Sequence, residues 1–544
     1  MKKTAAFLFT LTASIFCYSQ QTVGLFQAEP DTHPGYVLFA PFFSDSTFLI
    51  DNCGHVQHVW ASDYSVAAGV ELTETGELVR GCSFAGGTTF SGGGSGGRIE
   101  ALGDNSNVLW SFTYSDNFVR HHHDFTMMPN GNVLVVAWEL KSQADAIQNG
   151  RNPSFINPSG VWPDHIVEYS PGLGTIVWEW HSWDHLIQDF DPTKDNYGVV
   201  EDHPELIDIN FTNSANADWQ HFNSIDYNSA LDQILISSPV FDEIYIIDHS
   251  TTTLEAAGHS GGNSGKGGDL LWRWGNSSTY GGSSPQQLFF QHDATWIKNG
   301  NPSAGKIMVF NNGSGRTPVE YSSVDIIEPV LIANNNYEMG ANGFLPENNS
   351  YSYSAPNPTD FYSGIISSAQ ELSSGNIFIN EGNQGHFFEI NTNDDVVWDY
   401  VNPVVQDSIL AQEQVVPGNP TLYFNSVFRA RKIEMDFSGL DAITLVDNGP
   451  LERNPYPQTC FLSQEEVTVE KEMRIYPNPA NDILYIDTDD YETIDILDNL
   501  GKKIITKKIN GGMIHISELS PGIYFVEATN VQNDEKYISR LIKL

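Results

Sequence analysis

The chain has very little positive charge. Its 544 residues contain 26 Lys and Arg against 68 Asp and Glu, which gives a formal net charge of -42. Affinity for nucleic acids depends on basic side chains that neutralise phosphates, and no run of Lys or Arg is present to supply them. The composition therefore excludes nucleic acid and anionic membrane surfaces as partners. Any site for an anion has to be built locally, from the 16 histidines and a few arginines.

Long hydrophobic runs are also scarce. Lys2 and Lys3 precede an apolar run from Ala5 to Tyr18 that is too short to span a bilayer. A basic start followed by a short apolar run is typical of a cleaved secretory signal. We therefore predict a signal peptide over residues 1–20, an exported protein and no transmembrane segment. A buried N-terminal strand is the alternative.

Cysteine is rare, with four copies in the chain. Cys17 lies in the predicted signal peptide, and the bulky Phe16 before it disfavours a lipoprotein anchor. An exported protein permits one disulfide among the other three. Cys53, Cys82 and Cys460 leave the pairing open, and proximity in the sequence favours Cys53–Cys82.

Amphipathic helices are missing from most of the chain. From about residue 36 it consists of short strand-like runs separated by Gly, Asn, Asp and Ser turns, with no sustained helical period. Two apolar residues followed by Trp recur, ending at Trp110, Trp178, Trp272 and Trp398, and His-Val-Trp60 is a weaker first copy. Repeats of roughly 40 to 70 residues that each form a small antiparallel sheet are typical of a β-propeller. We expect an all-β fold with a six-bladed β-propeller over residues 21–465. A row of β-sandwiches is the alternative, but it would need linkers.

A second repeat runs in phase with the first. Its copies begin at His123, His221 and His292, and each continues through an alternating strand, a turn and an apolar strand. If the strand that opens each unit is the innermost of its blade, these three histidines occupy equivalent positions. We therefore expect them to converge at the central channel.

The tail, residues 468–544, differs in character from the rest. It contains Ile475-Tyr-Pro-Asn-Pro-Ala480, Leu519-Ser-Pro-Gly522 and a final strand that ends at Leu544. It resembles the type A C-terminal sorting domain of type IX secretion. That resemblance implies a small C-terminal β-sandwich, the type IX secretion machinery as a partner, and a secreted or cell-surface location. A small carbohydrate-binding sandwich is the alternative.

The expected propeller resembles the bacterial arylsulfate sulfotransferases through several motifs in order. These are Arg120-His-His-His-Asp-Phe125, Asp218-Trp-Gln-His221-Phe-Asn223, Gly267-Gly-Asp-Leu-Leu-Trp-Arg-Trp-Gly275, Gln291-His292-Asp293, Phe310-Asn-Asn-Gly-Ser-Gly-Arg316 and Asn425-Ser-Val-Phe-Arg429-Ala-Arg431. The resemblance implies a six-bladed propeller that moves a sulfuryl group from a phenolic sulfate ester to a phenol acceptor. The family does this through a sulfated histidine and without a nucleotide, so we predict no cofactor and no metal.

Sulfuryl transfer needs a nucleophile, cationic donors for the sulfuryl oxygens and an acid or base for the phenolic oxygen. By motif, His221 and His292 correspond to sulfate-binding or proton-transfer positions. Arg316 corresponds to the guanidinium that holds the sulfuryl group. The best match to the nucleophile is His386, in Gly382-Asn-Gln-Gly-His386.

Three further residues are predicted to bind the substrate, namely Asn223, His123 and Arg429. The chain departs from the family pattern at Ala294, where family members can carry an amide. One sulfate contact is therefore missing, or another residue such as Asn223 or Asn311 supplies it.

Other features have simpler interpretations. The cluster from His121 to Asp124 could ligate a metal, but only His121 and His123 share a face of a strand, which favours polar residues lining the channel. The acidic segment 184–191 does not fit an EF-hand and is interpreted as a solvated loop. The glycines of 92–97 are interpreted as a flexible connection. Blade-core packing is favoured over contact with an aryl ring for Trp138, Trp162, Trp183 and Trp296.

Two other functions stay open at this point. One is a non-catalytic exported propeller that binds a glycan or another surface ligand, which Ala294 favours. The other is a sulfatase-like hydrolase, in which water replaces the phenol.

Overall fold

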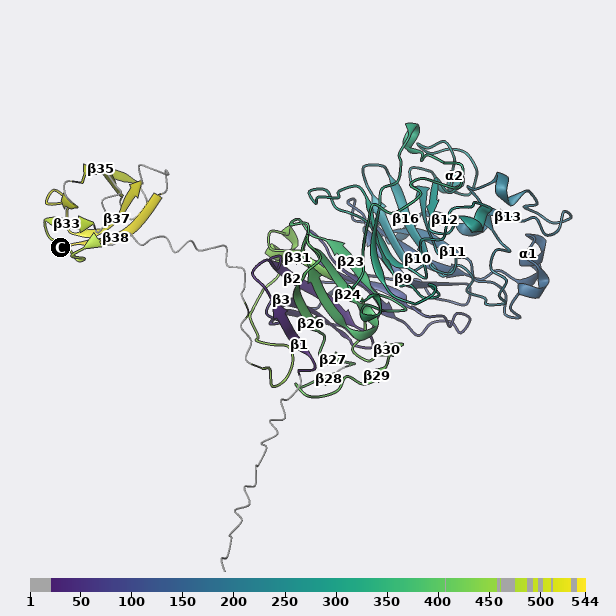
Figure 1. The fold of residues 1–544 in the computed structure, drawn as a ribbon, viewed down its shortest axis with the longest axis horizontal. Coiled ribbons are helices and arrows are strands. Elements are labelled where there is room, and N and C mark those ends of the chain that lie inside the picture. The colour runs from purple at the N-terminus through teal and green to yellow at the C-terminus, as the bar shows by residue number, and fades with distance from the viewer. Residues whose placement is uncertain are drawn as a thin grey trace, which may run out of the picture. The chain divides into compact units, whose positions relative to one another are not determined.

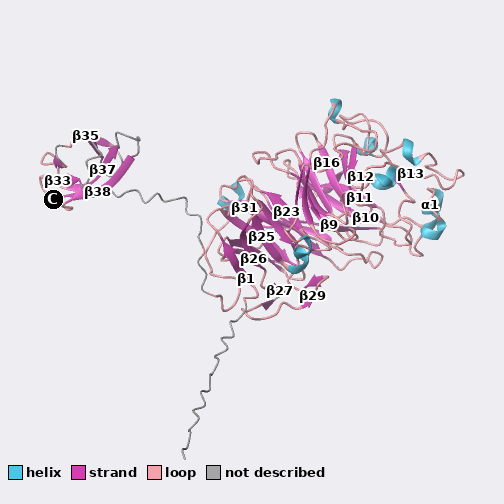
Figure 2. Cartoon of the chain, in the orientation of Figure 1, coloured by secondary structure: helices cyan, strands magenta, loops and turns pink. Residues whose placement is uncertain are grey.

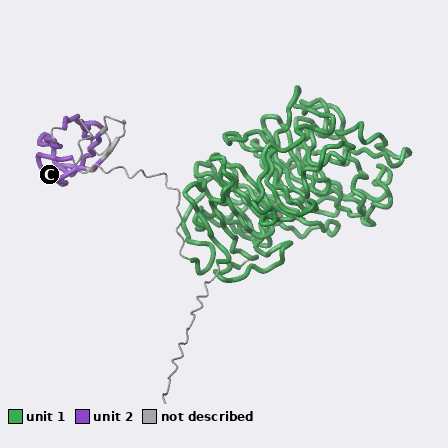
Figure 3. Tube along the Cα trace, in the orientation of Figure 1, with its two compact units in different colours: residues 1–462 green, residues 463–544 purple. Residues whose placement is uncertain are grey.

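The computed structural model describes residues 21–406, 408–456, 460, 475–486, 493–497, 502–509, 512–529 and 536–544. The predicted signal peptide, residues 1–20, lies outside the described residues. The chain divides into two compact units, residues 1–462 and 463–544 (Figure 3). Within the described ranges, no helix has the length and apolar content that a membrane crossing requires.

Among the described residues, the first unit consists mainly of six antiparallel sheets, and most of its regular structure is strand (Figures 1 and 2). The first three blades, each from its inner to its outer strand, are β5 (Val66–Leu72), β6 (Leu78–Ser83), β7 (Gly97–Leu102) and β8 (Val108–Thr113); β9 (Val119–Met127), β10 (Val133–Glu139), β11 (Asp164–Ser170) and β12 (Thr175–His181); and β15 (Ser224–Asn228), β16 (Gln233–Ser238), β17 (Glu243–Asp248) and β18 (Trp272–Trp274).

The other three blades complete the ring. They are β19 (His292–Trp296), β20 (Ile307–Asn311), β21 (Ser323–Ile327) and β22 (Tyr351–Tyr353); β23 (Ser368–Glu371), β24 (Ile377–Glu381), β25 (His386–Ile390), β26 (Val396–Val401) and β1 (Gly24–Ala28); and β31 (Val427–Glu434), β2 (Gly35–Pro41), β3 (Ser46–Asp51) and β4 (Val56–Ala61). The innermost strands β5, β9, β15, β19, β23 and β31 contact one another in turn around the ring. The predicted six-bladed β-propeller is confirmed.

Strands from the two ends of the unit close the ring. β31 pairs with β2, so the last blade takes its innermost strand from late in the chain and its other three from the start. β1 adds to β26 as the outermost strand of the preceding blade. In Figure 1 the purple strands β1–β3 accordingly lie among the green strands β24–β31.

Each blade buries both faces, because a hydrophobic cluster fills each of the six interfaces between neighbouring blades. The recurring Trp of the sequence lies on the fourth strand out from the axis, in β4, β8, β12, β18 and β26. Two of these indoles donate to a backbone carbonyl of the next blade's loops: Trp398 Nε1 to Asn52 O at 2.7 Å and Trp272 Nε1 to Leu345 O at 2.9 Å. The Trp repeat therefore marks contacts between blades.

Side chains at one repeated position also tie four of the six inner strands to the next blade. Each accepts a hydrogen bond from the backbone N–H of the following inner strand, and a buried N–H needs such a partner. The pairs are Asp124 with Ile225 N (3.0 Å), Ser224 with Ala294 N (3.0 Å), Asp293 with Ala369 N (3.0 Å) and Ser368 with Ala430 N (3.2 Å).

Loops carry the remaining short elements. The helices are α1 (Gln143–Gln148), α2 (Thr253–Ala256), η1 (Pro153–Phe155), η2 (Ser182–Asp184), η3 (Val200–Asp202), η4 (Ser277–Tyr280), η5 (Ala333–Asn335), η6 (Pro358–Asp360), η7 (Gly382–Gln384) and η8 (Ser438–Ala442). The short strand pairs are β13 (Leu186–Ile187) with β14 (Ile207–Asp208), β27 (Val404–Val405) with β28 (Ser408–Ile409), and β29 (Gly418–Asn419) with β30 (Leu422–Tyr423).

The second unit is a small β domain. One sheet consists of β32 (Ile475–Tyr476), β33 (Ile483–Ile486) and β36 (Met513–His515), and the other of β34 (Thr493–Leu497), β35 (Lys503–Lys508), β37 (Gly522–Thr529) and β38 (Lys536–Lys543). Residues of both sheets, such as Leu484 and Val526, share one hydrophobic core. The predicted C-terminal β-sandwich is confirmed.

The favoured disulfide pairing is wrong. Cys53 pairs with Cys460, with Cα atoms 5.4 Å apart, and Cys82 is a buried free thiol in β6. Proximity along the chain failed as a guide because ring closure returns the end of the unit to the turn between β3 and β4. The disulfide therefore links the two ends of the propeller sequence.

This pairing predicts the behaviour of thiols in the secreted chain, residues 21–544. Burial raises the pKa of Cys82 to about 12, so its thiolate is scarce and shielded. The native protein should show no thiol reactive to an aromatic disulfide reagent, and one after unfolding. Cys460→Ser should add a second, Cys53, whereas an unchanged thiol count in that variant would contradict the pairing.

Candidate functional site

Left-handed backbone occurs within or just before three neighbouring inner strands. His123, His221 and Asp293 have φ values of 55°, 59° and 55°. Such values are uncommon outside glycine and cluster at functional sites. They also break the alternation of side chains, and the pairing of β9 with β10 shifts register at this point. The end of the propeller where these strands begin is therefore where a site is expected.

The three histidines that open the repeats converge, as predicted. The ring centroids of His123 and His221 lie 4.4 Å apart in an edge-to-face arrangement. Phe428 of β31 lies between two of them, 6.1 Å from the His123 ring and 6.4 Å from the His292 ring. Side chains from three blades and from the closing strand thus share one end of the channel.

A carboxylate orients His221. Its Nδ1 contacts Oδ2 of Asp218, three residues earlier, and Trp138 Nε1 donates to the other carboxylate oxygen at 3.0 Å. With Nδ1–H directed at a carboxylate, Nε2 of the neutral ring carries the lone pair. Within the described part of the chain, no hydrogen bond is made to His221 Nε2. His221 is therefore held with a free nitrogen.

A second chain of contacts leads from His123 into the protein. His123 Nδ1 lies 2.8 Å from His122 Nδ1, and His122 Nε2 lies 2.7 Å from Asp164 Oδ1. His122 also stacks on Trp138, with centroids 3.9 Å apart. Burial, followed by the charge of Asp218, raises the pKa of Asp164 well above its usual value. His122 therefore lies between His123 and Asp164, although neither His122 Nε2 nor Asp164 Oδ1 makes a hydrogen bond in this orientation.

The prediction that only His121 and His123 share a face is wrong. His122 accompanies His123, whereas His121 Nδ1 lies 3.1 Å from the Val136 carbonyl within its own sheet. The reason is the left-handed backbone of His123, which turns the strand by one residue.

His292 has both ring nitrogens occupied. Nδ1 lies 2.8 Å from Asn312 Oδ1, and the N–H of Ile366 donates to Nε2 at 3.2 Å. Burial lowers the pKa of His292 to about 4. Burial and then the imidazoles of His221 and His292 also lower the pKa of His123, to well below its usual value. His123 and His292 are therefore neutral near pH 7.

A cleft of about 500 Å³ opens beside His221. It is lined by polar uncharged groups, four apolar side chains and the His221–Asp218 pair. The lining residues are Thr89, Ser91, Gly92, Gly93, Asn157, Ser159, Trp162, Asn216, Ala217, Asp218, His221, Val240 and Phe290. Of the tryptophans considered from the sequence, Trp162 lies in this cleft and Trp138 behind it.

The glycine-rich segment is part of the cleft and is held against the histidines. A Cβ on Gly94, whose φ is +66°, would lie 2.4 Å from the His123 ring. Arg120 clamps the same segment, since its guanidinium donates to the carbonyls of Phe84, Gly86 and Gly96. Glycine is needed here because the backbone passes directly over an imidazole.

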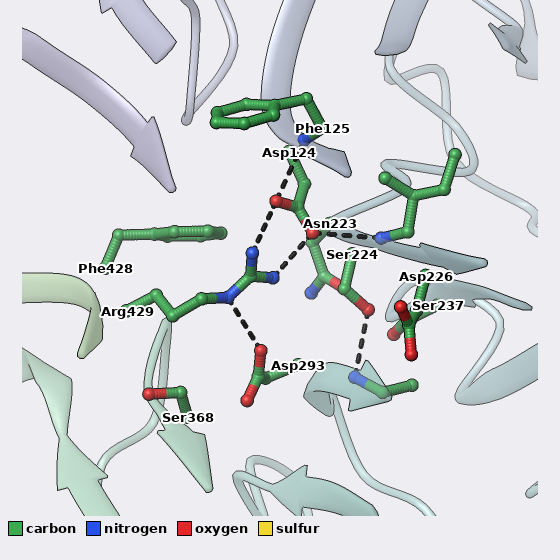
Figure 4. A network of polar contacts seen from close by, with 12 residues as sticks. Asp124, Phe125, Asn223, Ser224, Asp226, Ser237, Asp293, Ser368, Phe428 and Arg429 are labelled. Atoms are coloured by element: carbon green, nitrogen blue, oxygen red, sulfur yellow. Dashed lines mark hydrogen bonds and ion pairs between the residues drawn. The ribbon is translucent and has the colours of Figure 1, made fainter. Parts of the chain in front are cut away.

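Arg429 lies on the channel axis and is neutralised by two carboxylates (Figure 4). Its Nη1 and Nη2 donate to both oxygens of Asp124, at 2.7 and 2.5 Å, and Nε donates to Asp293 Oδ1 at 2.8 Å. Arg431 donates to both oxygens of Asp293. Because all three nitrogens of its guanidinium donate to carboxylates, Arg429 does not present a free cation.

Asn223 lies beside this network (Figure 4). Its amide donates to the carbonyl of Gln291 at 2.8 Å, while its Oδ1 is buried without a partner. It links two neighbouring blades beneath the histidines.

The structure does not bring His386 to the cluster. It begins β25, the third strand out from the axis, and its nitrogens lie 3.0 Å from Glu381 and 3.2 Å from Asp399. Burial opposes its charging, but these two carboxylates raise the pKa of His386 to about 10. An imidazolium has no lone pair with which to attack sulfur.

Arg316 is also placed apart from the cleft lining. Its guanidinium lies over the rings of Tyr321 and Phe289, at 4.1 and 5.3 Å, and donates to Ser323 Oγ at 3.1 Å. Arg316 follows β20 in the same loop as Asn312, and the side chain of Asn312 contacts His292. The structure therefore brings together His123, His221 and His292, and leaves His386 and Arg316 outside.

Sequence reasoning missed three groups, namely Asp218, His122 and Asp164. Asp218 stands three residues before His221 in one of the motifs quoted above, so the sequence contained a signal that the two could pair. The sequence contains no such signal for Asp164, because it is 42 residues from His122 and reaches it only through the pairing of β10 with β11.

Residues 27–416 match the arylsulfotransferase (ASST) family. The chain belongs to that family. Residues 474–543 match the secretion system C-terminal sorting domain, which indicates export to the cell surface or secretion. No curated protein matches the chain.

Two solved structures similar to the chain are distant. A protein of unknown function from Bacteroides caccae is 12% identical, with 68% of this chain and 93% of that chain covered and a TM-score of 0.38. Virginiamycin B lyase from Staphylococcus aureus is 9% identical, with 71% and 90% covered and a TM-score of 0.33. At such scores we draw nothing further from either.

The Arg429 network should be a large source of stability in this arylsulfotransferase-family propeller. Arg429→Met leaves Asp124 as an unpaired buried charge, so we expect a loss of about 3–5 kcal/mol in the free energy of unfolding. Asp124→Asn in the Arg429→Met background should restore part of it. Denaturant titration of the cycle tests this, with exposed Arg453→Gln as the control. Additive losses would contradict the coupling.

His386 should stabilise the fold in a pH-dependent way. Its folded pKa of about 10 lies above the ordinary value of about 6.5. The contribution is therefore complete below pH ~6.5 and is lost as pH rises through about 10. The difference in unfolding free energy between wild type and His386→Gln should be largest near pH 6 and shrink towards pH 10. A difference that grows with pH would exclude this ion pair.

Proposed function

We propose that the chain is an exported aryl-sulfate sulfotransferase in which His221 attacks the sulfuryl group. The observation that carries this is the free Nε2 of His221 at a cleft, with Nδ1 held by Asp218. A neutral imidazole suits attack on a sulfate ester because it brings no negative charge towards an anion. We also propose that residues 1–20 are removed on export, that residues 21–465 form the catalytic unit, and that residues 468–544 are the sorting domain.

The transfer takes place in two balanced steps. In the first, the Nε2 lone pair of His221 forms a bond to sulfur, the bond from sulfur to the aryl oxygen breaks, and the leaving phenoxide takes a proton from His123 Nε2, which leaves Asp164 ionised. In the second, a phenol gives its proton to His123 Nε2, its oxygen bonds to the sulfur, and the sulfur–nitrogen bond breaks. Trp162, Phe290 and Val240 supply apolar surface for the aryl rings.

His123 is the proposed acid and base. In the proposed relay the His122 ring turns so that Nε2–H donates to ionised Asp164, whose Oδ1 lies 2.7 Å away, while His123 Nδ1–H donates to His122 and His123 Nε2 is left as the base. When His123 Nε2 takes up a proton, the Nδ1 proton of His123 moves to His122 Nδ1, and the Nε2 proton of His122 moves to Asp164. Asp164 is then protonated. The raised pKa of Asp164 favours this uptake. The later return of the proton regenerates the base.

The cleft also has a feature that favours a second candidate function. No Lys or Arg is among its lining residues, although guanidinium and ammonium groups are the usual partners of sulfuryl oxygens. Hydroxyls, asparagines and Trp162 suit a neutral sugar equally well. A non-catalytic glycan-binding propeller is therefore the second candidate.

The intact mass of the secreted chain after mixing with an aryl sulfate alone distinguishes the two. We expect a sulfuryl adduct on wild type and His386→Gln but none on His221→Ala. Transfer to a phenol should fall at least about 10³-fold in His221→Ala and about 10²–10⁴-fold in His123→Gln. An adduct that survives His221→Ala but not His386→Gln would reassign the nucleophile, and no adduct on any protein would favour glycan binding.

Moderate salt should strengthen the binding of the aryl sulfate donor. The net charge of -42 repels an aryl sulfate anion, and salt screens that repulsion, with a Debye length of about 8 Å at 0.15 M. The KM for the sulfate donor should therefore fall as NaCl rises from low concentration to 0.15 M. A neutral phenol acceptor serves as the control, since its KM should change little. A donor KM that rises with salt would contradict this interpretation.

A further inference from the structure

Three side chains with metal-binding atoms meet in the loops of the second and third blades. His185 follows η2, and His259 and Asp269 lie in the loop between α2 and β18. Their ligand atoms all lie within 4.8 Å of one another, and among the described residues they form the one group of this kind. Asp269 Oδ1 lies 2.8 Å from His185 Nδ1 and 2.7 Å from His259 Nδ1. None of the three lines the cleft.

The contacts of His185 fix its tautomer. Its Nε2 lies 2.8 Å from the carbonyl oxygen of Ala256, which can only accept a hydrogen bond. The proton of a neutral His185 is therefore on Nε2, and Nδ1 presents its lone pair to a carboxylate oxygen. Two sets of lone pairs cannot face each other at 2.8 Å without a cation between them. That cation is either a second proton on His185 or a metal ion.

The surroundings favour a metal ion. Two imidazole nitrogens converge on the same carboxylate oxygen, Asp269 Oδ1, which is the arrangement of donor atoms that a shared metal ion takes up. In metal sites, the imidazole nitrogen that does not bind the metal commonly donates its proton to a backbone carbonyl, which orients the ring. His185 Nε2 and the carbonyl of Ala256 have this arrangement. Trp180 stacks on His185, at 5.6 Å between ring centroids, and fixes the plane of the ring.

The site also has the room that coordination needs. Ligand atoms of a tetrahedral zinc ion lie about 3.3 Å apart, since its bonds are about 2.0–2.1 Å long. The side chains of His185 and Asp269 are 0% and 9% exposed, whereas that of His259 is 63% exposed. His259 can therefore move outward by the fraction of an ångström required, and water can fill the fourth position.

We propose that His185, His259 and Asp269 bind one zinc-class transition-metal ion. Imidazole nitrogens with one carboxylate favour such an ion over Ca²⁺ or Mg²⁺, which take oxygen ligands. The ion links the loop after β12 to the loop before β18. Its role is structural, because the site is separate from the cleft. The proposal does not depend on sulfuryl transfer.

Zinc titration of the tag-free, chelator-treated secreted chain tests the proposal by calorimetry and thermal melting. Wild type should bind one Zn²⁺ at this site and melt at a higher temperature with Zn²⁺ than without it. His259→Ala should lower the affinity about 10–100-fold and abolish the thermal shift. This variant should fold, because its side chain is exposed. Asp269→Asn should behave in the same way.

His203→Ala is the matched control. His203 is an exposed histidine, 2.9 Å from Glu205 in a neighbouring loop. It should leave the zinc affinity and the thermal shift unchanged. Co²⁺ should give a visible absorption band with wild type that is missing with His259→Ala. Equal zinc affinity in wild type and His259→Ala, or no zinc binding by wild type, would overturn the proposal and leave a protonated His185–Asp269 pair.

Discussion

The guanidinium of Arg429 is the interaction on which the propeller depends. It belongs to the closing strand β31 and bonds to carboxylates on the second and fourth blades, so one side chain joins three blades across the axis. Because Asp124 and Asp293 also accept backbone N–H groups of the following blades, the ion pairs and the ring of hydrogen bonds form one network (Figure 4). A buried charge network of this kind is stable only when every member is paired.

The site is built on the same ring. The residue before Asp124 is His123, and the residue before Asp293 is His292. The hydrogen bonds of the Arg429 network therefore also fix the position of these two imidazoles along the inner strands. Left-handed backbone at His123 and His221 accompanies the approach of their rings to 4.4 Å, and His221 lines the cleft. In this cluster each histidine has a different partner: Asp218, His122 or Asn312.

Repetition made much of this predictable. The Trp repeat and the in-phase histidines indicate six blades and a convergence point, since equivalent positions of a propeller meet at its axis. The same repeat does not tell His386 from a channel residue, because its position relative to the axis depends on which strand of the blade carries it. Nor does it show that the charge of Arg429 is already neutralised, since Asp124 is 305 residues away in sequence.

The sequence by itself determined the blade number, the sorting domain, the export route and the group of three histidines, because these depend on local patterns that recur along the chain. Only the tertiary structure decided the Cys53–Cys460 pairing, the roles of Asp164 and Asp218, and the meeting of His185 with Asp269. Each of these depends on which loops ring closure and blade packing bring together. Local periodicity carries no information about that, since the partners are set by contacts between strands and loops distant in sequence.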